Sequence, residues 1–456
     1  MVHRIPSAGG GACGREDEVL MRRNMAIPWF AAVLLAVPAG AQTFHGRVTT
    51  SLYAWERLPT DSTEVQHLRA YGLGIFHLEK IADPRLSVHT YVRVHGDLEE
   101  EVNELANYRI FNLYGQWQDR ARGFEARGGR MRVYAGVGNV AIDGGFASYR
   151  VRELGTVEGY VGVQVPLAGD ADIAGWDNRA YGARVTLDRY RDLRLALSFV
   201  HHNRKPLDYE EPGIYTGREL ELPAEQEQLY GADATWRFNS AARLYGRLEV
   251  DATQRRLKWG SGILSLAPPE SPWTGDVEYF HRAPSIYGNS LLSVFDGGDY
   301  DEVSGRAGYW VTPRVRLFGN LAATFFEGDD SERLAIGVER GPLSATYQHR
   351  SGYGGDLDGA SAAYRHPLRP WIDVRADGGV ARFRLDDTAD ESTVSGTVSV
   401  GTEIRPRRDL AFDLEIQNLS QDIATQPAFA GYTHDWRGLF RVSYWFFADW
   451  QGKGTR

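Results

Sequence analysis

Charged side chains recur at every second position in several short segments of this chain. Residues 243–251 read Arg-Leu-Tyr-Gly-Arg-Leu-Glu-Val-Asp, and residues 314–325 read Arg-Val-Arg-Leu-Phe-Gly-Asn-Leu-Ala-Ala-Thr-Phe. Because side chains of an extended strand point alternately to its two faces, each segment has one polar and one apolar face. A wall of guanidinium and carboxylate groups can orient and filter polar or ionic solutes by Coulomb forces. The sequence therefore indicates selective contact with small charged molecules.

Alternating segments of this kind follow one another from residue 42 almost to the end of the chain, and helical periodicity is nearly absent. Turn residues separate the segments. Short connections alternate with longer, often acidic ones, so they should gather on opposite rims of one sheet. The short connections are 82–84, 189–192, 239–241, 312–314, 340–342, 366–369 and 405–409, and the longer ones are 57–66, 97–105, 203–226, 258–300, 327–332, 351–358, 385–392 and 419–434.

The last alternating segment carries a resemblance. In residues 439–447, Phe440, Val442, Tyr444 and Phe446 share one side of a strand, with Arg441 on the other. An alternating C-terminal strand rich in aromatics resembles the closing strand of Gram-negative outer-membrane β-barrels of the porin-like superfamily, although this chain ends in 449–456 rather than in a bare aromatic. The resemblance implies an all-β protein: one transmembrane antiparallel barrel of about 20 strands, with about 18 as the alternative, short periplasmic turns and long extracellular loops.

The N-terminus has the pattern of an exported protein. Arg22 and Arg23 precede the apolar run 26–37, and 38–42 offer an Ala-x-Ala cleavage site, which is typical of a signal peptide over 21–41. Residues 1–20 do not fit that design and are interpreted as an upstream leader or a start codon placed too early. The barrel is expected over 42–456. We therefore predict the outer membrane of a Gram-negative bacterium, with membrane lipid, lipopolysaccharide and the barrel-assembly machinery as partners.

Composition excludes several other classes. The formal net charge is −9 and no basic cluster is present, which disfavours nucleic-acid binding. The single cysteine, Cys13, precedes the predicted cleavage site, so the exported chain has no thiol to bind a metal or to act as a nucleophile. A soluble β-sandwich or β-helix is the alternative fold. Tyr and Trp at the ends of the segments favour the membrane barrel, because aromatic girdles mark both of its interfaces.

The strand phases place a set of charged residues on the lumen side. Opposed basic and acidic walls are common in passive porins, and the resemblance implies a selective role here, while mutual solvation that braces the wall is the other interpretation. The predicted pore-lining residues are Arg93, Arg130, Arg132, Tyr134, Arg184, Arg243, Arg247, Glu249, Arg314, Arg316, Asp413 and Glu415.

One segment interrupts the strand rhythm. Residues 138–149 are rich in glycine, poor in charge and follow directly on the segment that holds Arg130 and Arg132. This segment resembles the inward-folded constriction loop of porin-like barrels, and a surface hairpin loop is the alternative. The residues expected to face the pore from it are Asn139, Asp143, Phe146 and Tyr149.

No enzymatic motif accompanies these features. His201, His202 and Asp208 are the only candidates for a hydrolase set, and no G-x-S-x-G, H-E-x-x-H or Walker pattern is present. The acidic segments 296–301 and 356–358 lack the ligand spacing of a calcium loop, so no metal or cofactor is predicted. We therefore expect a porin-like channel for passive diffusion of small polar or charged solutes and not an enzyme. The alternatives are a barrel with a structural or surface-binding role and, third, a barrel-type hydrolase.

Overall fold

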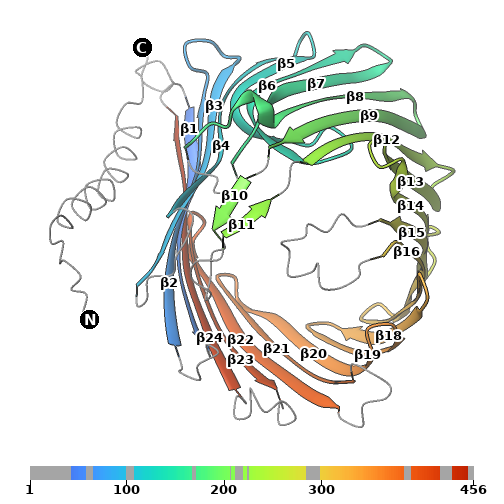
Figure 1. Cartoon of the computed structure of the whole chain (residues 1–456). Coiled ribbons are helices and arrows are strands. Elements are labelled where there is room, and N and C mark those ends of the chain that lie inside the picture. The colour runs from blue at the N-terminus through green and yellow to red at the C-terminus, as the bar shows by residue number, and fades with distance from the viewer. Residues whose placement is uncertain are drawn as a thin grey trace, which may run out of the picture.

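Antiparallel strands close into one sheet of 22 strands in the computed structural model (Figure 1). The structure describes residues 43–57, 65–98, 107–166, 171–205, 207–210, 219–222, 225–283, 298–384, 392–421 and 434–449. Each strand pairs with the next along the chain, and the first strand pairs with the last, Thr43 lying opposite Asp449. This last pairing removes both sheet edges, so the described sheet is a barrel.

The strand bounds in the first half are β1 Thr43–Arg57, β2 Val65–Glu79, β3 Leu86–Asp97, β4 Tyr108–Asp119, β5 Phe124–Val133, β6 Val140–Val151, β7 Gly155–Gln164, β8 Arg179–Tyr190, β9 Leu193–Arg204, β12 Glu225–Arg237 and β13 Ala242–Asp251. The second half contains β14 Arg256–Leu266, β15 Trp273–Arg282, β16 Tyr300–Thr312, β17 Val315–Phe326, β18 Asp330–Arg340, β19 Leu343–Gly352, β20 Asp356–Arg369, β21 Ile372–Arg384, β22 Thr393–Arg407, β23 Leu410–Gln421 and β24 His434–Asp449. Outside the barrel sheet lie a 3-10 turn, η1 Trp176–Asn178, and a small hairpin of β10 Leu207–Glu210 and β11 Glu219–Leu222.

The two faces of the barrel differ as the alternation predicts. On β17, Leu317 and Leu321 are 47% and 62% exposed although they are apolar, while Ala322 on the other face is buried. Directly opposed residues of paired strands lie on the same side of a sheet, so the register carries this assignment around the barrel. The outer face is an apolar belt, and the charged residues alternate with it on the face toward the lumen.

Short turns gather on one rim. Connections 80–85, 120–123, 152–154, 191–192, 238–241, 267–272, 313–314, 341–342, 370–371 and 408–409 all lie on the rim where β1 starts and β24 ends. The first of them is shaped by Asp83, whose carboxylate accepts hydrogen bonds from the backbone N–H of Arg85 at 2.8 Å and from its guanidinium at 3.0 and 2.9 Å. These bonds from Arg85 lower the pKa of the Asp83 carboxyl. The opposite rim has the long connections and some short ones, among them 327–329 and 353–355.

The strand number is higher than the sequence predicts. Segment 258–300 was expected to be a single long loop, but most of its first half lies in the wall as β14 and β15, which pair with each other and with β13 and β16. The Pro268-Pro269 pair begins their turn. Two more strands raise the expected 20 to 22, and the expectation of 18 is also wrong.

The predicted constriction loop over 138–149 is a strand for most of its length. Residues 140–151 form β6, which pairs with β5 through Val133 opposite Val140 and with β7 through Tyr149 opposite Val157. Asp143, Phe146 and Tyr149 therefore belong to a strand and not to a loop, and only Asn139 lies in a connection. Small residues fit a paired strand where backbones approach closely, and a Cβ on Gly144 would lie 2.5 Å from the Cα of Gly162. Low charge and glycine content do not by themselves distinguish such a strand from a loop.

No helix within the described residues is long and apolar enough to cross a membrane. The predicted leader 1–20 and signal peptide 21–41 lie outside the described residues.

Candidate functional site in the barrel lumen

Arginines stacked on aromatic rings cover one sector of the lumen, from β1 to β4. The guanidinium carbon of Arg69 lies 5.7 Å from the ring centre of Trp55. Arg93 lies 5.9 Å from the ring of Tyr71 and 5.6 Å from that of Phe111. Arg109 lies directly opposite Arg93 and is 5.3 Å from the same Phe111 ring. We call this set the arginine–aromatic arc; its members are Trp55, Arg69, Tyr71, Arg93, Arg109 and Phe111.

Two arginines of the arc, Arg93 and Arg109, have no carboxylate partner in the described part of the chain. Among the described residues, no carboxylate lies within 4.0 Å of the guanidinium of Arg93 or Arg109. Two arginines directly opposite each other on adjacent strands repel one another. Stacking on the face of an aromatic ring offsets part of this repulsion, by about 0.5–1 kcal/mol at an accessible site. The arc is therefore held in place by aromatic contacts while its charge stays available to a solute.

The opposite sector of the lumen has paired charges instead. Arg184 of β8 donates to Asp233 of β12 at 2.9 and 3.1 Å. Arg306 donates to Glu278 at 3.2 Å, and Arg316 to Glu339 at 3.3 Å. Cross-strand pairs of opposite charge stabilise the sheet locally. Several charges on β8 to β18 are thus compensated, although Arg237 of β12 and Arg243 of β13 also lie directly opposite each other.

A third group joins β21 and β23. Arg375 donates to Asp413 at 2.8 Å and to Glu415 at 2.6 Å. The three side chains are between one fifth and one third exposed, so water reaches them. One guanidinium faces two carboxylates here, so these three side chains together carry a net negative charge.

The β5–β6 hairpin folds into the barrel beyond Gly129. Gly129 has φ +127°, a conformation that favours glycine, and a Cβ there would lie 2.4 Å from the carbonyl oxygen of Leu113. The hairpin tip, residues 134–139, reaches strands far around the wall. The backbone N–H of Val137 donates to Ser198 Oγ of β9 at 3.0 Å, and Arg247 of β13 donates to the carbonyl of Gly136 at 3.4 Å.

Apolar packing fixes this hairpin against the inner wall. A Cβ on Gly231 of β12 would lie 2.0 Å from Val137, so only glycine leaves room for the tip there. The buried cluster around it consists of Met131, Val133, Ala135, Val137, Val140, Ile142, Phe146, Tyr160, Ala180, Val200 and Leu229. An apolar core inside the lumen shows that the tip is part of the fold, and that it occupies lumen space beside β8 to β13.

An ion pair on the other face of the same hairpin closes it. Arg130 donates to both oxygens of Asp143 at 2.8 Å, and its guanidinium also donates to the carbonyl of Asp172 at 2.7 Å. The Arg130 side chain is 5% exposed and that of Asp143 is 12% exposed. This buried pair braces the hairpin and is not open to a passing solute.

The structure places the predicted site residues in several different settings. Arg93 belongs to the arc, and Arg130 with Asp143 forms the hairpin's ion pair. Arg132, Tyr134 and Asn139 are exposed at the end of the hairpin, Phe146 is buried beneath Arg127 at 4.8 Å, and Tyr149 lies on the outer face with 50% exposure. The remaining predicted residues Arg184, Arg243, Arg247, Glu249, Arg316, Asp413 and Glu415 lie on the lumen-side phase of their strands, and Arg314 lies in the turn 313–314.

Of the arc's arginines, the sequence predicted only Arg93 to line the pore, and the inward segment was predicted over 138–149, which overlaps the inward hairpin in residues 138–143. Arg69 alternates correctly within β2, so strand phase was a usable signal for it. A register shift at Phe111 breaks the alternation of β4, so Arg109 could not be assigned in the same way. Nothing local marks residues 134–139, because their partners Ser198, Gly231 and Arg247 are remote in sequence.

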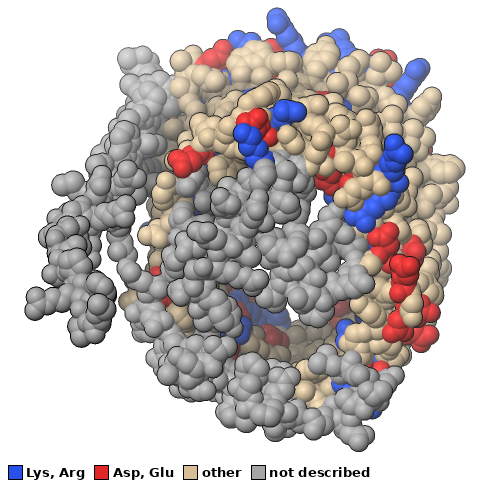
Figure 2. All heavy atoms as spheres, viewed as in Figure 1, with Lys and Arg blue, Asp and Glu red and all other residues tan. Residues whose placement is uncertain are grey.

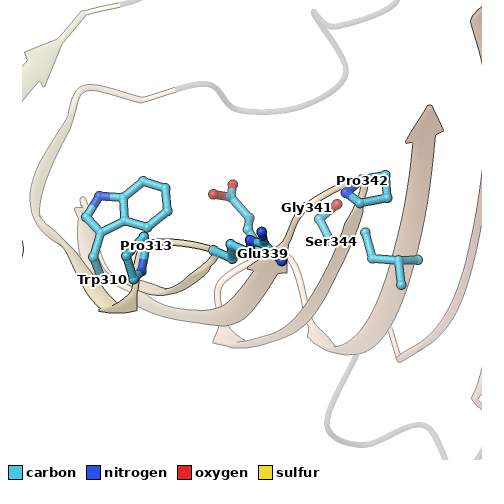
Figure 3. Close-up of a pocket in the computed structure, with 8 residues that line it drawn as sticks. Trp310, Pro313, Glu339, Gly341, Pro342 and Ser344 are labelled. Atoms are coloured by element: carbon cyan, nitrogen blue, oxygen red, sulfur yellow. The ribbon is translucent and has the colours of Figure 1, made fainter. Parts of the chain in front are cut away.

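Figure 2 shows basic and acidic side chains on the face of the barrel that is turned toward the viewer in Figure 1. At the short-turn rim, a shallow hollow of about 400 Å³ lies between the β16–β17 and β18–β19 turns. Trp310 and Pro313 line it from one turn, and Glu339, Gly341, Pro342 and Ser344 from the other (Figure 3). It is open to solvent and does not enclose a ligand site.

No family model matches the chain, and no curated protein matches it. Similar solved structures include the P pilus usher (PapC) translocation pore, at 9% identity and a TM-score of 0.46 over 89% of this chain and 99% of that one. Acinetobacter baumannii OccAB3 gives 9% identity and a TM-score of 0.43 over 89% and 99%. Pseudomonas aeruginosa OccK8 (OprE) gives 10% and 0.41 over 90% and 100%.

At these TM-scores the similarity carries no weight for function, and the architecture rests on the strand pairing of the chain itself. All strands of the closed sheet are antiparallel, their number is even, and an apolar belt covers the outside. Closed barrels satisfy every strand's backbone hydrogen bonds internally, as a bilayer requires. The described chain is a 22-stranded antiparallel barrel of the outer-membrane type.

Proposed function

We propose that the protein is an outer-membrane channel through which small polar or charged solutes diffuse passively. The observation that carries this proposal is the charged, hydrated inner face of a closed barrel. A purely structural barrel gains nothing from Arg93 and Arg109 lying opposite each other without a carboxylate partner, since like charges in register are destabilising. A solute with an anionic group would relieve that repulsion as it passes.

The uneven charge of the lumen suggests how a solute is oriented. The arc on β1 to β4 is positive, and the Arg375–Asp413–Glu415 group on β21 to β23 is net negative. A transverse field of this kind turns a dipolar solute so that its anionic end follows the arc. The hairpin tip 134–139 narrows the lumen on the side of β8 to β13, so passage would follow the remaining space.

The selectivity of the channel tests this proposal. Replacing Arg93 and Arg109 together by Ala removes two uncompensated positive charges and should shift the reversal potential in a salt gradient toward that of the cation. Arg407→Ala is the matched control, because Arg407 is bound to Asp409 in a short turn outside the lumen. An unchanged reversal potential in the double variant would remove the arc from the proposal.

The second candidate is a barrel with a structural or surface-binding role. The hairpin tip favours it in one respect, because a 22-stranded barrel is wide and an inserted segment fills part of it. Current recordings separate the two candidates, since only the channel conducts.

A further inference from the structure

Three histidines form a row across three consecutive strands on the lumen face, close to the short-turn rim. His45 of β1 lies directly opposite His77 of β2, and His77 lies directly opposite His89 of β3. Side chains opposed in this way have Cβ atoms about 4.5–5.5 Å apart. Imidazole rings at that spacing can turn their nitrogens toward a common point.

The nitrogens of His77 and His89 already point toward each other. Nδ1 of His77 and Nδ1 of His89 are 2.6 Å apart. A contact of this length requires a proton on one nitrogen and a lone pair on the other. Ser87 Oγ lies 2.9 Å from Nε2 of His89, on the far side of that ring. If Nε2 donates to this hydroxyl, the lone pair of His89 is on Nδ1 and points at His77.

Neighbouring side chains hold the rings in position and leave them accessible. The His89 ring stacks on Tyr114 with ring centres 5.0 Å apart, and the His77 ring stacks on His45 at 4.9 Å. His45 Nε2 lies 3.2 Å from a carboxylate oxygen of Glu79, and these two side chains are 35% and 43% exposed. Water and small ions can therefore reach the row from the lumen.

We propose that His77 and His89 chelate one divalent transition-metal ion of the Zn²⁺, Ni²⁺ or Cu²⁺ class. Neutral imidazole nitrogens are preferred ligands of these ions. Two nitrogens that each lie about 2.0–2.1 Å from a tetrahedral Zn²⁺ are roughly 3.3 Å apart, so the rings need to separate by less than about 1 Å.

The other ligand positions of the ion belong to water. Among the described residues, no set of three or more His, Cys, Asp or Glu side chains already surrounds one point, so the site is a two-imidazole chelate. Ser87 takes the position of the hydrogen-bond partner that orients a ligating histidine.

Titration of the folded, detergent-solubilised barrel without a polyhistidine tag tests this site. ZnCl₂ in a calorimeter should give one tight site per chain. His77→Ala and His89→Ala should each weaken it at least tenfold, and Ser87→Ala should weaken it less. His95→Ala is the matched control, because His95 lies on β3 on the same face and stacks on Tyr71, three cross-strand rows away. It should leave the Zn²⁺ affinity unchanged.

A second measurement reads the ligands directly. With CuSO₄ as the probe, the electron paramagnetic resonance spectrum should show hyperfine coupling to two imidazole nitrogens, and His77→Ala should remove the coupling to one of them. If either Ala variant fails to fold, His77→Gln and His89→Gln take its place, since Gln keeps a hydrogen-bonding group of similar length. Absence of Zn²⁺ binding by the folded wild-type protein, or a Zn²⁺ affinity in the His77 and His89 variants equal to that of the wild type, would overturn the proposal. The result is independent of conduction, because a barrel that passes no current would bind the metal equally well.

Discussion

At the scale of single residues, the partner of an arginine decides its role more than its position on the lumen side of the sequence pattern. Arg93 stacks on rings and has no acid beside it, Arg184 is bound to Asp233, and Arg130 is buried with Asp143. The three are indistinguishable in the alternating pattern. Only the first is free to act on a solute by its charge.

Arg130→Ala should destabilise the barrel by about 3–5 kcal/mol, because it leaves the Asp143 carboxylate buried without its partner. Removing both groups in Arg130→Ala/Asp143→Ala should cost less than the single change. Urea titration of tryptophan fluorescence in lipid vesicles measures both. The exposed pair Arg407–Asp409 is the control, and Arg407→Ala should cost about 0–1 kcal/mol. A double variant that is less stable than the single one would contradict a bracing role for the pair.

The outer face makes a second prediction at this scale. Leu317 lies on the apolar belt, so Leu317→Arg should cost about 2–4 kcal/mol of folding free energy in a bilayer. Asn320 lies on the same strand but on the other face, and Asn320→Arg should cost much less because the lumen is hydrated. The same urea titration compares them. Equal losses at the two positions would mean that the face assignment of β17 is wrong.

At the scale of elements, the β5–β6 hairpin bends out of the barrel wall and into the lumen. Gly129 permits the bend, and the apolar cluster around Ile142 holds the bent hairpin against β8 to β12. Burial of Ile142 is complete, at 0% exposure. The tip is therefore a fixed obstruction inside the barrel.

Shortening the tip should widen the path. Replacing residues 134–139 by a two-residue Asn-Gly turn removes the segment that contacts Ser198 and Gly231, and single-channel conductance should rise while the barrel still folds. A matched control shortens 252–255, the connection between β13 and β14 on the same rim, and should leave conductance unchanged. Equal conductance in a folded variant without the tip would show that the narrowest part of the lumen lies elsewhere.

Strands β17 and β14 and the hairpin tip differ in how well the sequence predicts them. The alternation of 314–325 predicted β17 and both of its faces, because a half-lipid, half-lumen strand must alternate. Segment 258–266 contains Gly260 and Gly262, whose lack of side chains hides the alternation, and β14 was missed for that reason. The position of the tip could not be predicted, since its bend depends on contacts with β9, β12 and β13, which follow 60 or more residues later.

At the scale of the whole molecule, closure of the sheet explains the composition. Each of the 22 strands presents one face to lipid and one to the lumen, so the protein can be rich in charge and still have an apolar exterior. The same closure pairs β1 with β24, and the separate pairing of β1 with β2 places His45 opposite His77. A barrel of this size has a wide lumen, and the inserted tip, the arc and the paired charges together determine what remains open.

Single-channel current in a planar lipid bilayer tests the central claim most directly. The wild-type barrel, refolded in detergent and verified by its heat-dependent mobility on a gel, should insert in discrete steps and conduct with a linear current–voltage relation. The charged lumen predicts this result, because an aqueous path lined by ionic groups carries ions without a gating step. Folded protein that inserts into the bilayer and passes no current would contradict the account and favour a barrel with a structural or surface-binding role.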